Sequence, residues 1–154
     1  MSLWKTCGTV LIVAALLQSP SGMAAGRSTK IAVKDRSNAF ASITASGRFA
    51  AIAWGATKDG VTDIYTSVSR DGGRSFGAPT RVNSAGVLAN VSGEQPPRVT
   101  LIHRANLDPA IVVVWTAKSD AGTRLFSARS DNGGQSFAPS QPVPGTSSTD
   151  HRCR

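Results

Sequence analysis

The sequence predicts an all-β fold built from a repeated four-stranded antiparallel unit. Short runs rich in Val, Ile, Thr and aromatic residues alternate with Gly, Asp, Asn and Pro, and no segment after residue 26 keeps a helical period. One eight-residue pattern also occurs twice, ending at Phe76 and at Phe137, which are 61 residues apart. A repeat of this length indicates a supersecondary unit that cannot bury its apolar face alone.

The repeat extends beyond that pattern without a gap. At the same spacing Trp54 matches Trp115, and Val82 matches Val143. The other matched pairs are Ala56 with Ala117, Asp59 with Asp120, and Thr62 with Thr123. Such copying argues against a two-sheet sandwich, whose strands do not normally copy one another. A four-stranded antiparallel unit repeated about every 60 residues is typical of a β-propeller blade.

Each unit is predicted to contain an opening strand, an apolar strand ending in Trp, an alternating strand and a short last strand. For the first part we predict Lys30–Val33, Phe40–Ala45, Arg48–Trp54, Asp63–Ser69 and Thr80–Val82. For the second part we predict Arg98–Ile102, Ala110–Trp115, Thr123–Ser130 and Gln141–Val143. The blades thus span about 36–83 and 96–144, within a region 26–145, and the polar stretch Ser84–Gln95 links them.

The first 25 residues have the pattern of a signal peptide. Lys5 gives a positive start, Val10–Leu17 is an apolar run, and Gly22–Gly26 offers small residues for cleavage. The apolar run is too short to span a membrane, which takes about 20 residues. We therefore predict a secreted or periplasmic protein with no membrane span after cleavage. Residues 146–154 have no strand pattern and are predicted to be a disordered tail.

The chain is basic, with a formal net charge of +8. Its Lys and Arg residues are scattered without a dense block, so we expect no specific nucleic-acid binding; a loose attraction to anionic surface polymers remains open. Cys7 is lost with the signal peptide, which leaves Cys153 alone and allows no intrachain disulfide.

The repeated pattern has the chemistry of a tight turn. Its copies are Ser69-Arg70-Asp71-Gly72-Gly73-Arg74-Ser75-Phe76 and Ser130-Asp131-Asn132-Gly133-Gly134-Gln135-Ser136-Phe137. A Gly can take positive φ, Asp71 can accept hydrogen bonds from turn amides, and an aromatic ring can anchor the turn. Asn132 replaces the Asp in the second copy, but its carbonyl oxygen can still accept.

This pattern resembles the Asp-box, or BNR repeat, of the sialidase superfamily of β-propellers. The resemblance covers about residues 36 to 145 and implies that the boxes join the third and fourth strands of each blade, away from any pocket. It implies structural roles rather than catalytic ones for the motif residues. These residues are Ser69, Asp71, Gly73, Ser75, Phe76, Ser130, Asn132, Gly134, Ser136 and Phe137.

The chain departs from the family at its catalytic signals. Ala41 stands where a substrate-binding Arg belongs, and Ala53–Ala56 lacks a second expected Arg. Alanine cannot supply the bidentate fork that a carboxylate substrate needs. Sialidases use a Tyr nucleophile, but Tyr65 precedes the first box, whereas the family nucleophile comes from a late blade. Asp59 and Asp63 lie where the family has its general acid, although Asp59 is better explained as a turn former. We therefore predict no catalytic residue.

Other residue types add little chemistry. His103 and His151 lack partners at ligand spacing, so no metal site and no cofactor are expected. Trp54 and Trp115 can stack on sugars, but matched strand positions more often pack between blades. Arg98 opens the second unit and is predicted to be the ligand-binding residue of a pocket.

Together these features predict an exported, sialidase-like Asp-box propeller fragment, noncatalytic or incomplete, that binds glycans or other anionic surface polymers. One alternative is an exo-α-sialidase-type glycoside hydrolase whose catalytic blades are missing here, and another is a protein-interaction scaffold. Because two blades do not close a ring, open sheet edges are expected to favour self-association.

Overall fold

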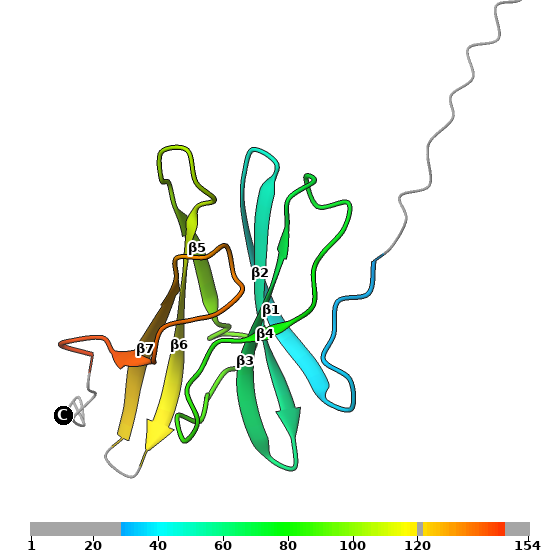
Figure 1. Ribbon diagram of the computed structural model, residues 1–154. Coiled ribbons are helices and arrows are strands. Elements are labelled where there is room, and N and C mark those ends of the chain that lie inside the picture. Colours follow the sequence, from blue (N-terminus) through cyan, green and yellow to red (C-terminus); the bar gives the residue numbers. More distant parts are fainter. Residues whose placement is uncertain (1–28, 120–121, 147–154) are drawn as a thin grey trace, which may run out of the picture.

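The structure is a computed structural model that describes residues 29–119 and 122–146. It consists of two four-stranded antiparallel sheets in which the strands follow one another in chain order (Figure 1). The first sheet contains β1 (Ser37–Ser46), β2 (Phe49–Lys58), β3 (Val61–Ser69) and β4 (Thr80–Arg81). The second contains β5 (Arg98–Ile102), β6 (Ala110–Ser119), β7 (Gly122–Ser130) and β8 (Gln141–Pro142). No helix occurs among the described residues, and the all-β prediction is confirmed.

Tight turns set the register of the first sheet. Asp59 and Gly60 join β2 to β3 with φ values of +51° and +76°, the two positive angles that a type I′ hairpin turn requires. Asp59 is therefore a turn former, as the sequence predicted. The β1–β2 turn at residues 47–48 also uses positive φ, at Gly47. In the second sheet the corresponding connection is the much longer loop of residues 103–109.

The predicted strand Lys30–Val33 is wrong. Residues 29–33 form no strand, although every other predicted range overlaps one. The reason lies in Asn38, whose side chain accepts a hydrogen bond from Val33 N (2.9 Å) and donates one to Val33 O (3.0 Å). The segment is therefore held against the first sheet by the Asn38 side chain, and its backbone does not form a hydrogen-bond ladder with another strand.

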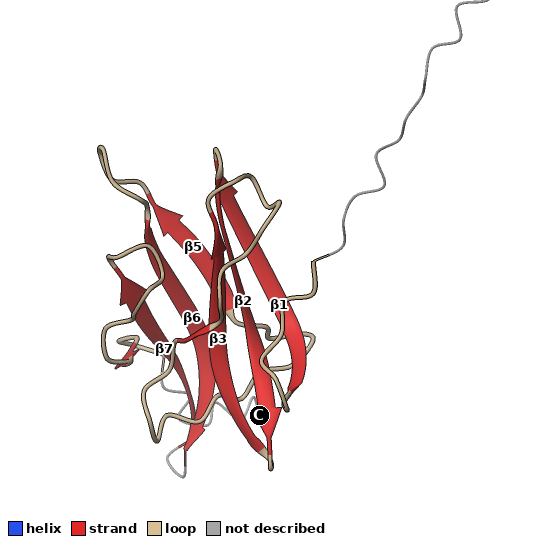
Figure 2. Ribbon diagram, turned by 45° about the vertical axis from the view of Figure 1, so that its right-hand side comes forward, coloured by secondary structure: helices blue, strands red, loops and turns tan. Residues whose placement is uncertain are grey.

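The main core lies between the two sheets (Figure 2). From the first sheet it receives the small side chains of Ala51 and Ala53, both fully buried, together with Ile64 and Val68. From the second sheet it receives large side chains, which are Ile111, Val113 and Trp115. Large side chains therefore pack over small ones, which allows the sheets to approach closely at interior packing density.

The two matched tryptophans lie on different sides of the molecule. Trp115 is 1% exposed and lies in the core between the sheets, as expected for packing between blades. Trp54 is also buried but faces the other way, on the outer side of the first sheet and not between the two sheets. Its indole Nε1 donates to Asn38 Oδ1 (2.9 Å), and its ring stacks on Tyr65.

Polar contacts between loops also join the two sheets. Ser84 N donates to Ser140 Oγ and Ser140 N donates to Ser84 Oγ, each at 2.8 Å. The connecting segment runs along the second sheet, where Ala89 and Ala117 form an isolated antiparallel bridge. These contacts fix the linker to both sheets and satisfy backbone groups that burial would otherwise leave unpaired.

Several sequence-based predictions lie outside the described residues. They concern the signal peptide (1–25), most of the tail (147–154), and the residues Asp120, His151 and Cys153. Within the described ranges, no helix has the length and apolar character needed to cross a membrane.

The matched glycines Gly73 and Gly134 test how the sheets meet. Both have positive φ, but an added Cβ would meet nothing at Gly73, whereas at Gly134 it would lie 2.6 Å from Val68 Cγ2. We expect Gly73→Ala to lower the free energy of unfolding by about 1 kcal/mol, the cost of the left-handed conformation. Gly134→Ala should cost about 2–4 kcal/mol because it also overpacks the core. Urea unfolding measures both, and equal losses would contradict the packing described here.

Candidate functional site

The first repeated loop, between β3 and β4, is held by its own side chains. Ser69 Oγ donates to Asp71 Oδ1 (2.7 Å) and accepts from Gly73 N (2.8 Å). Asp71 Oδ1 also accepts from Ser75 N (2.9 Å), and Asp71 Oδ2 accepts from Ser75 Oγ (2.5 Å). The carboxylate therefore lies at the centre of the turn and accepts hydrogen bonds there through both of its oxygens.

The second repeated loop, between β7 and β8, has the same network with an amide at its centre. Ser130 Oγ donates to Asn132 Oδ1 (2.9 Å) and accepts from Gly134 N (2.9 Å). Asn132 Oδ1 accepts from Ser136 N (3.0 Å), while Asn132 Nδ2 donates to Ser136 Oγ (2.7 Å). The carbonyl oxygen thus keeps the accepting role, and only the direction of the hydroxyl bond is reversed.

The central residues of both loops are occupied by these bonds. Hydrogen bonds from Ser75 lower the pKa of Asp71 well below its ordinary value of 3.8. The bond from the Ser75 hydroxyl has the largest effect, and the bond from its backbone amide has the next largest. An ionised carboxylate has no proton to donate, and its hydrogen bonds all come from groups of its own loop. Asp71 is therefore suited to shaping the loop and not to general acid catalysis.

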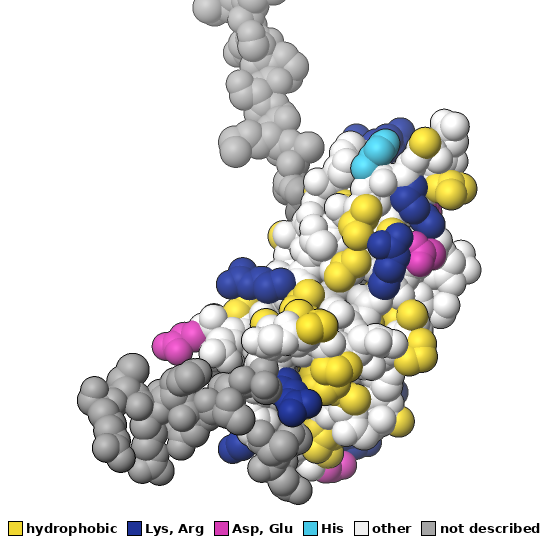
Figure 3. Space-filling model, turned by 90° about the vertical axis from the view of Figure 1, so that its left-hand side faces the viewer, with side chains coloured by type: hydrophobic (Ala, Val, Ile, Leu, Met, Phe, Trp, Pro, Cys, Tyr) yellow, Lys and Arg dark blue, Asp and Glu magenta, His cyan; other side chains and the backbone are white. Residues whose placement is uncertain are grey.

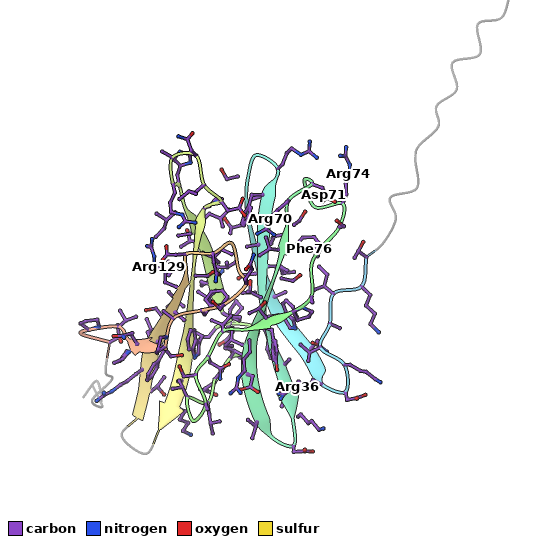
Figure 4. All side chains as sticks on the ribbon, viewed as in Figure 1. Arg36, Arg70, Asp71, Arg74, Phe76 and Arg129 are labelled. Carbon is purple, nitrogen blue, oxygen red and sulfur yellow. The ribbon has the colours of Figure 1, made fainter. Side chains whose placement is uncertain are left out.

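The aromatic residues that end the two loops are both half-buried. Phe137 packs against the core between the sheets, and Phe76 lies beneath its own loop (Figure 4). The two loops are thus alike inside but differ in what surrounds them, because only the second lies against another sheet.

A groove of about 370 Å³ opens between the sheets at the end where these loops lie. We call it the loop-end groove. Its walls come from the β1–β2 turn, the start of β2, the first repeated loop and the β5–β6 loop. The lining residues are Ser46, Gly47, Arg48, Phe49, Arg70, His103, Leu107, Asp108 and Pro109.

Arg70 lines the loop-end groove and is bound by groups of the second sheet's loops. Its Nε and Nη2 atoms bind Asp108 Oδ2 at 2.9 Å and 2.8 Å, and Nη2 also donates to Gly133 O at 3.0 Å. Its guanidinium lies over the Phe49 ring, 5.5 Å from the centroid. Figure 4 shows Arg70 between the sheets, whereas Arg74 projects from the loop above. Arg70 therefore joins the two halves of the groove.

The groove also has donors that no protein group occupies. The side chains of Arg48 and His103 are exposed and have no hydrogen-bond or ion-pair partner in the part of the chain that the structure describes. Leu107, 66% exposed, adds an apolar wall. Figure 3 shows basic side chains gathered with a histidine at this end of the molecule. A free guanidinium beside an imidazole and an apolar wall can bind a carboxylate or sulfate on a sugar.

Comparisons with known proteins leave the family open. No family model matches the chain, and no curated protein or solved structure is significantly similar to it.

Asp63 and Tyr65, which the sequence analysis weighed against the family's catalytic residues, lie away from the loop-end groove. Asp63 is 2% exposed and forms ion pairs with Arg36 Nη1 at 3.0 Å and with Arg81 Nη2 at 2.7 Å. Asn83 Nδ2 also donates a hydrogen bond to it at 3.0 Å. Tyr65 lies next to this cluster with the Arg36 guanidinium 5.7 Å from its ring centroid. Both arginines are paired with Asp63, whose charge reduces their attraction for a substrate carboxylate.

Arg98 lies outside the loop-end groove. It is exposed at the start of β5, has no ion-pair partner within residues 29–119 and 122–146, and lines none of the cavities described above. Its ligand-binding role stays a prediction. The described residues also contain no cluster of His, Cys, Asp and Glu that would bind a metal.

Sequence reasoning missed the loop-end groove and the burial of Asp63. The groove joins Arg48 to His103, which are distant in the sequence and belong to no motif. The sequence did contain a local signal for the position of Asp63. Side chains alternate along β3, so residue 63 lies on the same face of the sheet as Tyr65.

The pH dependence of stability tests the role of Asp71. Because its pKa is lowered in the folded protein, the unfolded chain binds the proton first as the pH falls. The stabilisation is therefore complete above the ordinary value of 3.8 and is lost below it. We expect Asp71→Asn to lower Tm at neutral pH, with the difference from wild type shrinking between about pH 5 and pH 2.

Thermal scans by circular dichroism at several pH values measure this difference. Glu94→Gln removes an exposed carboxylate that makes no hydrogen bond in the described chain and is the control. A difference for Asp71→Asn that does not change with pH would show that the carboxylate charge has no part in holding the loop.

Proposed function

We propose that this protein is an exported, noncatalytic relative of the sialidase superfamily, built from Asp-box propeller blades, that binds an anionic glycan or another anionic surface polymer in the loop-end groove. The observation that carries the binding proposal is the pair of unoccupied side chains, Arg48 and His103, beside an Arg70 that is already neutralised by Asp108.

The family part of the proposal is supported by the shared network of the two loops. Ser, Asp or Asn, Gly and Ser take the same places in both, and each loop joins the third and fourth strands of its sheet. The export part is supported by the sequence pattern of residues 1–25.

The noncatalytic part is supported by what the acidic and phenolic groups do. Asp71 is bound within its loop, and Asp63 is bound by two arginines. Tyr65 lies against Trp54 and Arg36. A glycosidase needs a free acid opposite a nucleophile across the scissile bond, and these residues do not form such a pair.

The size and chemistry of the groove favour a charged polymer over a small apolar ligand. Its volume of about 370 Å³ is at the low end for ligand pockets, which suits one or two residues of a chain that continues past the groove. The basic net charge, formally +8 for the full sequence, adds a general attraction for polyanions, and this attraction weakens with salt.

Binding to heparin and to polysialic acid tests the proposal. We expect the double change of Arg48→Ala and His103→Ala to weaken binding about tenfold, because hydrogen bonds to a charged group are lost. The control is the double change of Lys34→Ala and Lys58→Ala, two exposed cations away from the groove, which should have a much smaller effect. Titration of each polymer by calorimetry at fixed salt measures the change.

Two outcomes would contradict the proposal. Equal losses for the two double variants would mean that only net charge attracts the polymer. Release of the fluorophore from a fluorogenic sialoside by the wild-type protein, and not by a mock preparation, would mean that the protein is an enzyme.

A further inference from the structure

The two sheets pack head to tail, through faces of different kinds. Trp54 pairs with Tyr65 and Trp115 with Phe126, so the face of each sheet that bears its Trp is equivalent. We call it the Trp face and call the opposite face of each sheet its receiving face. The Trp face of the second sheet packs on the receiving face of the first. Because the faces differ, the same contact can be repeated without limit unless a ring closes.

The receiving face of the second sheet has the same residue pattern as the receiving face of the first sheet, which is covered by the second sheet. At a spacing of 61 residues, Ile64 corresponds to Leu125. The other correspondences are Ala51 with Val112, Ala53 with Val114, Thr66 with Ser127, and Val82 with Val143. Ile64 is fully buried by the second sheet, whereas Leu125 is 36% exposed. The second sheet therefore has an apolar face of the receiving kind that the described residues leave partly open.

The Trp face of the first sheet has the complementary vacancy. Val99 pairs with Val113 on the Trp face of the second sheet and packs against the core between the sheets. The equivalent residue is Ile43, which pairs with Ile52 and is 65% exposed. Val99 thus contacts a neighbouring sheet, whereas Ile43 contacts none among the described residues.

The segment before the first sheet lies beside Trp54 but leaves Ile43 open. Val87, Ala89 and Val91 precede the second sheet and pack against the core between the sheets. In the same way Ile31 precedes the first sheet and lines an apolar cavity of about 130 Å³ with Ile52 and Trp54. Such a segment is part of the existing contact, so it can also be part of a new one.

We propose that copies of this chain associate head to tail, with the Trp face of one copy's first sheet packed on the receiving face of the next copy's second sheet. The partner is a second copy because this chain carries both halves of a contact that it already makes internally. At the loop end Arg129, bound to Asp131, replaces Val68, so that end of the new contact is polar.

The geometry of the sheets favours a closed ring. The sheets approach most closely where β5 faces β1 and β2, and they spread apart toward β4 and β8 (Figures 1 and 2). Successive sheets therefore turn about an axis beside β1 and β5. Closed rings of such sheets contain about four to eight members, so we expect two to four copies.

Sedimentation velocity of the full chain, with its masses checked by light scattering, tests the proposal. The wild-type protein is expected to have a mass of about two to four chains. Leu125→Asp damages only the receiving face and Ile43→Asp damages only the Trp face, so each variant should be a monomer. Leu88→Asp changes a residue of the linker that is 49% exposed and should keep the wild-type mass.

Mixing the two damaged variants gives the decisive result. One copy then supplies an intact Trp face and the other an intact receiving face, so the mixture should form a complex of two chains and nothing larger. Circular dichroism spectra like that of wild type confirm that each variant folds.

Three results would overturn the proposal. The first is a wild-type chain that stays monomeric at its highest soluble concentration, which would assign the faces to another partner. The second is a wild-type mass that neither variant changes. The third is a mixture that stays monomeric, because two copies related by a twofold axis would use one face only and could not be rescued by mixing.

Discussion

The structure depends on the close packing of large side chains from the second sheet over alanines of the first. Ala51 and Ala53 are fully buried and leave space for Ile111, Val113 and Trp115. Neither four-stranded sheet has a second apolar layer of its own within the described residues, so each contributes half of one core. The hydrophobic core cluster lies in this contact, and burial of its apolar surface stabilises the fold.

The repeated loops are organised separately from that core. The hydrogen bonds of Asp71 and Asn132 are short-range and remain within their own loops, so this part of each loop does not depend on a neighbouring sheet. The contact with the neighbouring sheet enters at only a few points, such as Val68 against Gly134 and Arg70 against Gly133. A loop with a fixed shape at the end of a strand can therefore place an arginine across the junction between two sheets.

The sequence predicted what is local and periodic. The strands β2 and β6, the turn at Asp59 and the Asn132 loop follow from apolar runs, turn residues and repeat spacing. It did not predict where Trp54 faces. The repeat places Trp54 and Trp115 on equivalent faces of their sheets, but only the face that carries Trp115 packs against the other sheet. The error at Lys30–Val33 has a related cause, since a strand needs a partner and Asn38 takes the backbone groups of Val33 instead.

The candidate site was beyond prediction because it arises from two loops of unequal length at matching places in the two sheets. The turn at residues 47–48 is short and the loop at residues 103–109 is long, so their ends meet across the junction and enclose a groove. The core fixes the strands, and variation is therefore concentrated in the loops. Because both sheets line the groove, loosening the core also changes the groove. Only exposed residues such as Arg48 and His103, which make no contact that the fold needs, can separate binding from folding.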